Sequence, residues 1–108
     1  MSSYDPLDIQ GQQRAREEQE LRERLSREQE ASDVVWLMKS KQGRRVVWRH
    51  LERAGVFRSV FSTNAMQMAF NEGHRNYGLV MLDAVNRLAP DAYPVMMAEN
   101  APKEEPKA

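Results

Sequence analysis

The chain has 108 residues, which is enough for one small domain with a modest hydrophobic core. Its 16 basic and 16 acidic residues cancel, so net charge gives no argument for a nucleic-acid or membrane partner. It has no cysteine, no apolar run of the ~18–20 residues that span a bilayer and no signal-peptide layout at its start, so we expect a cytosolic protein without a disulfide framework, or one packaged there into a particle.

Residues 1–32 are expected to form a charged helical arm, with five basic and eight acidic residues. Asp5 is a candidate cap, Pro6 suits the first helical position, and Asp8 falls in the first turn. Opposite charges recur four residues apart, at Arg14–Glu18, Glu18–Arg22, Glu20–Arg24 and Glu23–Arg27. Because apolar residues are few and no heptad register persists, we expect the arm to order mainly on a partner. A merely solvated N-terminus is the equal alternative.

Residues 33–100 have the apolar content of a small helical domain. Ser32 or Asp33 is expected to cap a short helix over 34–38, which the stretch 39–43 breaks. A further helix is predicted from about Arg44 to Ala54, with Gly55 in the C-terminal stop position. Residues 56–61 form an apolar connector that has no strand to pair with.

A long helix is predicted from a cap at residues 62–64 to about Leu88, where Pro90 ends it. Its apolar stripe has helical spacing and is expected to face the core: Met66, Phe70, Gly73, Tyr77, Val80 or Met81, Ala84 and Leu88. Gly73 and Gly78 indicate close approach of another backbone, because glycine is otherwise costly in a helix. Asp91 is expected to cap a last short helix, and residues 101–108 to be disordered. The predicted fold is therefore all-α, with about four helices.

A basic stripe on the second of these helices is the first candidate site. Seven basic residues and one acidic residue lie between Lys39 and Arg58, and Arg45, Arg49 and Arg53 share one helix face. Such a face suits a phosphate backbone, with Trp36 and Trp48 as stacking residues if they are exposed. The favoured alternative is a solvated face that pairs with the acidic arm of the same or a neighbouring subunit, with both tryptophans in the core.

The sequence contains no constellation that indicates catalysis or metal binding. His74 near the apolar stripe is interpreted as a core or boundary residue, and Arg75 with Asn76 as a tie to a loop or neighbour. Arg44 projects toward the apolar side of its helix, where it would bond helix carbonyls or an acidic partner. Two histidines and no phosphate-binding or nucleophile motif leave an enzyme as the least favoured class, with no metal and no cofactor expected.

Two linked motifs carry a family resemblance. They read G-R-x-x-x-W-x-x-L-x-x-A-G-V-F at residues 43–57 and E-G-x-R-N-x-G-L at 72–79, and are followed by P-D-A-Y at 90–93 and M-A-E at 97–99. Over about residues 33–99 the chain resembles a family of small tailed-phage proteins, typified by a product of a Bordetella podovirus and found among head-assembly genes. The arm and the tail lie outside the resemblance.

The resemblance implies a phage-encoded particle or morphogenesis component and carries no known activity. It also implies a shared structural signature, which consists of Gly43, Arg44, Trp48, Gly55, Phe57, Gly73, Arg75, Asn76 and Gly78. We therefore expect a non-enzymatic minor virion or head-assembly protein that contacts portal, capsid or internal proteins, in the host cytoplasm or the virion. Self-association is open, and a DNA-binding module or a host-directed regulator are the alternatives.

Overall fold

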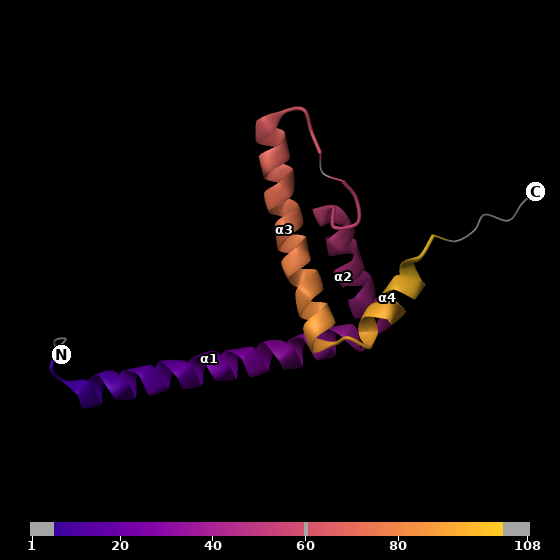
Figure 1. Cartoon of the computed structure of the whole chain (residues 1–108). Helices are drawn as coiled ribbons and strands as arrows, with labels where there is room; N and C mark the ends of the chain where they lie inside the picture. Colours follow the sequence, from indigo (N-terminus) through magenta and orange to yellow (C-terminus); the bar gives the residue numbers. More distant parts are fainter. Residues whose placement is uncertain (1–5, 60, 103–108) are drawn as a thin grey trace, which may run out of the picture. The chain divides into compact units, whose positions relative to one another are not determined.

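The computed structural model describes residues 6–59 and 61–102 of the chain. The described residues form four helices and no strand, which confirms the all-α prediction (Figure 1): α1 (Ile9–Met38), α2 (Lys41–Ala54), α3 (Ala65–Leu88) and α4 (Ala92–Asn100). The chain divides into two compact units, Met1–Ser32 and Asp33–Ala108. The predicted cap at Asp5 and most of the predicted disordered tail lie outside the described residues.

Helix α1 begins at Ile9, later than predicted, and Asp8 caps it. The Asp8 carboxylate accepts a hydrogen bond from the Gly11 amide at 2.9 Å, so Asp8 precedes the first turn instead of lying within it, and Pro6 precedes the helix. Side chains between Gln13 and Glu30 are exposed. In the described part of the chain the ion pairs are Arg44–Glu99 and Arg87–Asp83, and none forms at the four charge pairs predicted in the arm. Instead Gln13 and Gln19 donate hydrogen bonds to Glu17 and Glu23, one turn on.

The separate short helix predicted after Ser32 is wrong, because α1 continues through residues 32 and 33 to Met38. Residues 12–38 contain neither glycine nor proline, so no residue interrupts the hydrogen-bond ladder. Serine and aspartate lower helix propensity by less than about 0.7 kcal/mol each, which the flanking helix tolerates. The change of composition at residue 32 therefore marks the boundary between the two units but not the end of a helix.

The corner between α1 and α2 depends on Ser40 and Gly43. The Ser40 hydroxyl accepts a hydrogen bond from the Gly43 amide at 2.9 Å, so α2 begins at Lys41 rather than near Arg44. Gly43 is buried inside the first turn, where a Cβ atom would overlap the backbone carbonyl of Leu37. Only glycine therefore permits this close approach of the two helices.

The end of α2 and the start of α3 follow the sequence prediction. Gly55 has φ 79° in the left-handed region, and its amide caps the last turn of α2. This turn sends Val56 into the core, where it is buried. Asn64 accepts a hydrogen bond from the Gln67 amide at 2.9 Å and caps α3, which ends at Leu88 as predicted.

The core lies where α2 packs against α3 and α4 (Figure 1). It is formed by Met38, Val47, Leu51, Ala54, Val56, Val85 and Met96. Gly78 of α3 lies against the end of α2, because a Cβ atom there would come within 2.5 Å of the Ala54 Cβ and 2.6 Å of the Val56 Cγ2. The close approach predicted for Gly78 is thus confirmed.

The apolar stripe predicted to face the core is exposed over most of α3. The exposed fractions are 85% for Met66, 67% for Phe70, 70% for Tyr77 and 59% for Val80. The face that packs on α2 is the one that holds Gly78 and Val85. Helix α3 has 24 residues and α2 has 14, so α2 cannot cover the whole length of α3 (Figure 1). For Gly73 the predicted close approach is wrong in the part of the chain that the structure describes, since a Cβ atom there would meet none of its atoms within 4 Å.

Two further predictions about apolar and capping residues need correction. Trp36, expected in the core, is 74% exposed, whereas Trp48 packs at the core and stacks on Phe57 with ring centroids 4.8 Å apart. Asp91 precedes α4 but its side chain makes no capping hydrogen bond. Helix α4 is instead held by Met96, which is fully buried in the core. Its short length leaves tertiary packing as the main source of its stability.

Candidate functional site

Arg44 makes four side-chain hydrogen bonds within the domain. Its Nε lies 2.6 Å from Glu99 Oε1 and its Nη2 lies 3.0 Å from Glu99 Oε2, which is a bidentate ion pair between α2 and α4. Its Nη1 donates to the carbonyls of Met38 and Lys39, both at 3.0 Å. The Arg44 and Glu99 side chains are 14% and 18% exposed. One guanidinium thus joins α4 to the corner between α1 and α2, by both kinds of contact that its sequence position suggested.

The ion pair changes the titration of both partners. Hydrogen bonding to Arg44 lowers the pKa of Glu99 below its ordinary value, and the nearby charges of Lys41 and Arg45 act in the same direction. Hydrogen bonding to Glu99 raises the pKa of Arg44. Partial burial opposes both shifts because it disfavours the charged forms. The pair is therefore charged at neutral pH, and it holds helices together rather than presenting a reactive group.

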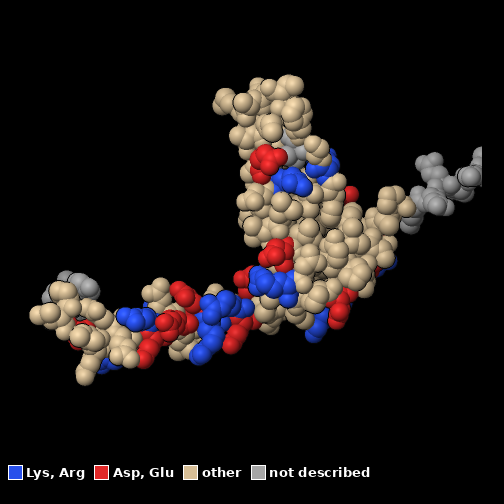
Figure 2. Space-filling view, viewed as in Figure 1, with Lys and Arg blue, Asp and Glu red and all other residues tan. Residues whose placement is uncertain are grey.

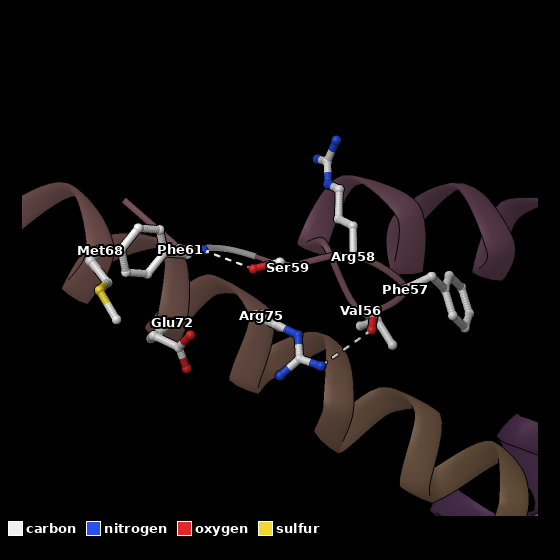
Figure 3. A pocket seen from close by; sticks show the side chains of 8 residues that line it. All are labelled: Val56, Phe57, Arg58, Ser59, Phe61, Met68, Glu72 and Arg75. Atoms are coloured by element: carbon white, nitrogen blue, oxygen red, sulfur yellow. Dashed lines mark hydrogen bonds between the residues drawn. The ribbon is translucent and has the colours of Figure 1, made fainter. Parts of the chain in front are cut away.

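An open pocket of about 530 Å³ lies between the connector after α2 and the N-terminal half of α3 (Figure 3). Arg75 and Glu72 line it from α3, and Phe61 and Ser59 line it from the connector. Arg75 Nη2 donates to the Val56 carbonyl at 3.4 Å, which is the tie to a loop that the sequence suggested. Its buried Nε has no hydrogen-bond partner. Arg75 and Ser59 thus hold the connector through hydrogen bonds to its backbone.

The basic face of α2 lies apart from these structural contacts. Arg45, Arg49 and Arg53 are all exposed, at the i, i+4, i+8 spacing that places them on one side of the helix. Val47 and Leu51, on the opposite side, are buried. The exposure of this basic face is compatible with both interpretations of the sequence, a contact with a macromolecular partner and a solvated face.

His74 does not occupy the core or boundary position expected from the sequence. It is exposed, and its ring stacks on Phe70 with centroids 5.9 Å apart. Asn76 is exposed as well. Over residues 6–59 and 61–102 the structure holds no group of three acidic or histidine side chains that could bind a metal ion. No helix in the same residues is long and apolar enough to cross a membrane.

The motif residues gather at two places in the domain. Gly43 and Arg44 form the corner that receives Glu99, and the second group lies where the end of α2 meets α3: Trp48, Gly55, Phe57, Arg75 and Gly78. Gly73 and Asn76 join neither group, since both face solvent. Glu99 belongs to the M-A-E motif at 97–99, but the sequence did not identify it as the acidic partner expected for Arg44. It lies 55 residues from Arg44, and no local pattern connects them.

A comparison with known protein families matches a segment that lies within the second unit of the chain, Asp33–Ala108. The sequence model of the family described as Bbp19-like phage protein matches residues 34–98, which is more than half of the chain. Searches of the curated proteins and of the solved structures gave no significant match. The match includes both groups of motif residues, and it ends one residue before Glu99. The chain therefore belongs to the Bbp19-like phage protein family.

Proposed function

We propose that this phage protein is a non-enzymatic structural or assembly component, either a minor virion protein or a head-morphogenesis factor. The observation that carries the proposal is the set of large apolar side chains exposed on a folded domain: Trp36, Phe61, Met66, Phe70 and Tyr77. Exposed apolar surface of this extent is typical of proteins that contact other proteins. The partners are then particle or assembly proteins, such as portal, capsid or internal proteins.

The polar groups of the domain support an interaction role over catalysis. In the polar cluster of Arg44 with Glu99, Arg44 bonds the carbonyls of Met38 and Lys39 and holds α4 in place through Glu99. Arg75 bonds the Val56 carbonyl in the same manner. A general acid or base needs a partner that activates it and space for a substrate, and these arginines are engaged in structural contacts instead. No catalytic residue and no cofactor are proposed.

Mass spectrometry of purified virions tests the proposal. Full particles from the source phage are compared with particles that have released their DNA, and with assembly intermediates from infected cells. We expect the chain in at least one of these samples at a constant ratio to the capsid protein. Presence in both mature samples would indicate a shell, portal or tail protein, and presence only in full particles an internal protein. Absence from all three would contradict the proposal.

The exposed face of α2 supports a second candidate function, which is DNA binding through Arg45, Arg49 and Arg53. Affinity would then fall steeply with salt, because bound phosphates release counterions. Replacing all three arginines by alanine should reduce the slope of log K against log salt by about 2–3. The matched control is the triple change of Arg14, Arg22 and Arg27 in the arm. Binding that is absent or independent of salt would exclude this function.

A further inference from the structure

We propose that the exposed stripe of α3 packs against the same stripe of a second copy of the chain, with the two helices crossing at Gly73. The stripe consists of Met66, Phe70, Gly73, Tyr77 and Val80. Their spacings of four, three, four and three residues keep all five on one side of the helix. Each of the four side chains is more than half exposed. The inference is independent of which particle protein the chain contacts.

The size of the stripe fits an interface between two copies. A fully exposed aromatic side chain presents on the order of 150–250 Å², so the four exposed side chains together present on the order of 500 Å². Two such surfaces bury on the order of 1,000 Å², which reaches the lower range of specific protein interfaces. A patch of this size also lies at the upper range of what a single soluble chain exposes. Burial against a second copy removes it from water.

The charge pattern favours a second copy over a charged partner. Between Ala65 and Val80 the aspartate, glutamate, lysine and arginine side chains of α3 are limited to Glu72 and Arg75. At 100° per residue both lie away from the stripe, and Arg75 points to the connector. The next charges, Asp83 and Arg87, lie beyond the stripe and pair with each other at 3.6 Å. Figure 2 shows uncharged atoms over most of the visible surface at the N-terminal end of α3. Two copies of an uncharged face meet without like-charge repulsion.

Gly73 places the crossing point. Glycine inside a helix costs about 1 kcal/mol relative to alanine, and nothing among the described residues requires it, because a Cβ atom there would have no described neighbour within 4 Å. A second backbone approaching at this point supplies the missing reason. With antiparallel helices related by a two-fold axis at Gly73, Phe70 lies opposite Tyr77 of the second copy, and Met66 opposite its Val80. Aromatic rings then meet aromatic rings, and the stripe is complementary to itself.

Sedimentation equilibrium of the full chain tests the interface. We expect a monomer–dimer equilibrium whose dissociation constant rises about 30-fold or more for Phe70→Glu or Tyr77→Glu, the change typical of a central interface residue. Leu25→Glu is the matched control, because Leu25 is also more than half exposed and lies outside the stripe. It should leave the constant unchanged. Circular dichroism confirms that each variant is folded.

Cysteine cross-linking locates the crossing. The chain has no cysteine, so a single introduced thiol reports only on its own position. Under mild oxidation Gly73→Cys should give a covalent dimer, and Glu72→Cys, on another face of the same turn, should not. A wild-type chain that stays monomeric, as it would if residues 6–32 of the same chain covered the stripe, overturns the proposal. So does a dimer that tolerates both glutamate substitutions, or one that cross-links equally at both cysteines.

Discussion

The carboxylate of Glu99 in α4 meets the guanidinium of Arg44 in α2 side-on, so that both carboxylate oxygens accept hydrogen bonds from one arginine. The third nitrogen of the same guanidinium donates hydrogen bonds to the carbonyls of Met38 and Lys39. Met38 is the last residue of α1, and Lys39 follows it in the corner. The short α4 is therefore held by the ion pair together with its core contacts, of which Met96 is fully buried. This arrangement needs the planar, forked geometry of arginine, which lysine lacks.

Replacing Arg44 by lysine should lower the thermal stability of the domain, although the charge is retained. Lysine offers a point charge and cannot bond two carboxylate oxygens and two carbonyls at once. In a double-mutant cycle with Glu99→Gln, differential scanning calorimetry should show non-additive effects. The control is Asp83→Asn, which removes the exposed pair with Arg87 and should leave the melting temperature nearly unchanged. Additive effects of the Arg44 and Glu99 changes would contradict the coupling.

The same pair predicts a specific loss of stability in acid. The pKa of Glu99 is lowered in the folded protein, mainly by its hydrogen bond to Arg44. The contribution of ionised Glu99 to the free energy of unfolding is therefore fully present above the ordinary pKa of a glutamate. It is lost as the pH falls through the lowered pKa. The difference in unfolding free energy between the wild type and Glu99→Gln should be constant near neutral pH and should shrink toward zero in acid. Urea unfolding at a series of pH values measures it, and a difference that persists in strong acid would refute this account.

Two glycines of α3 should respond to alanine in opposite directions. Gly78→Ala brings a methyl group against Ala54 and Val56, and such overpacking typically costs about 1–3 kcal/mol, more than the helix-propensity gain. Gly73→Ala meets no described atom within 4 Å and should stabilise the monomer by about 1 kcal/mol. Chemical unfolding at low protein concentration compares the two variants. A stabilised Gly78→Ala would contradict the close packing of α2 on α3.

Truncation of Leu51 should show where the core lies. Leu51 is fully buried, and replacing such a leucine by alanine typically costs about 2–5 kcal/mol in unfolding free energy. Met66→Ala removes a side chain of similar size that is 85% exposed, and should change monomer stability by less than about 0.5 kcal/mol. Both variants are measured by urea unfolding below the concentration at which copies associate. Similar losses of unfolding free energy for Leu51→Ala and Met66→Ala would contradict the exposure of Met66 on α3.

The elements with local signals were predictable. Gly55 ends α2 because the left-handed conformation that stops a helix favours glycine, and Asn64 starts α3 because its side chain bonds a free amide three residues on. The continuous α1 was missed because Ser32 and Asp33 are capping residues that a helix also tolerates in its interior. The start of α2 was missed because Gly43, read as a breaker, is required by the approach of Leu37.

By itself the sequence determined that the chain is helical, where most helices begin or end, and which family it belongs to, since these depend on local chemistry and on residue identity. Only the tertiary structure decided which face of α3 is buried. The longer and more hydrophobic stripe is exposed, and the face with Gly78 and Val85 is buried instead, because Gly78 lets α3 approach the end of α2 closely. It also decided which acid meets Arg44. Helical periodicity orders residues around one axis, but the partner across the core is set by packing between helices that are distant in sequence.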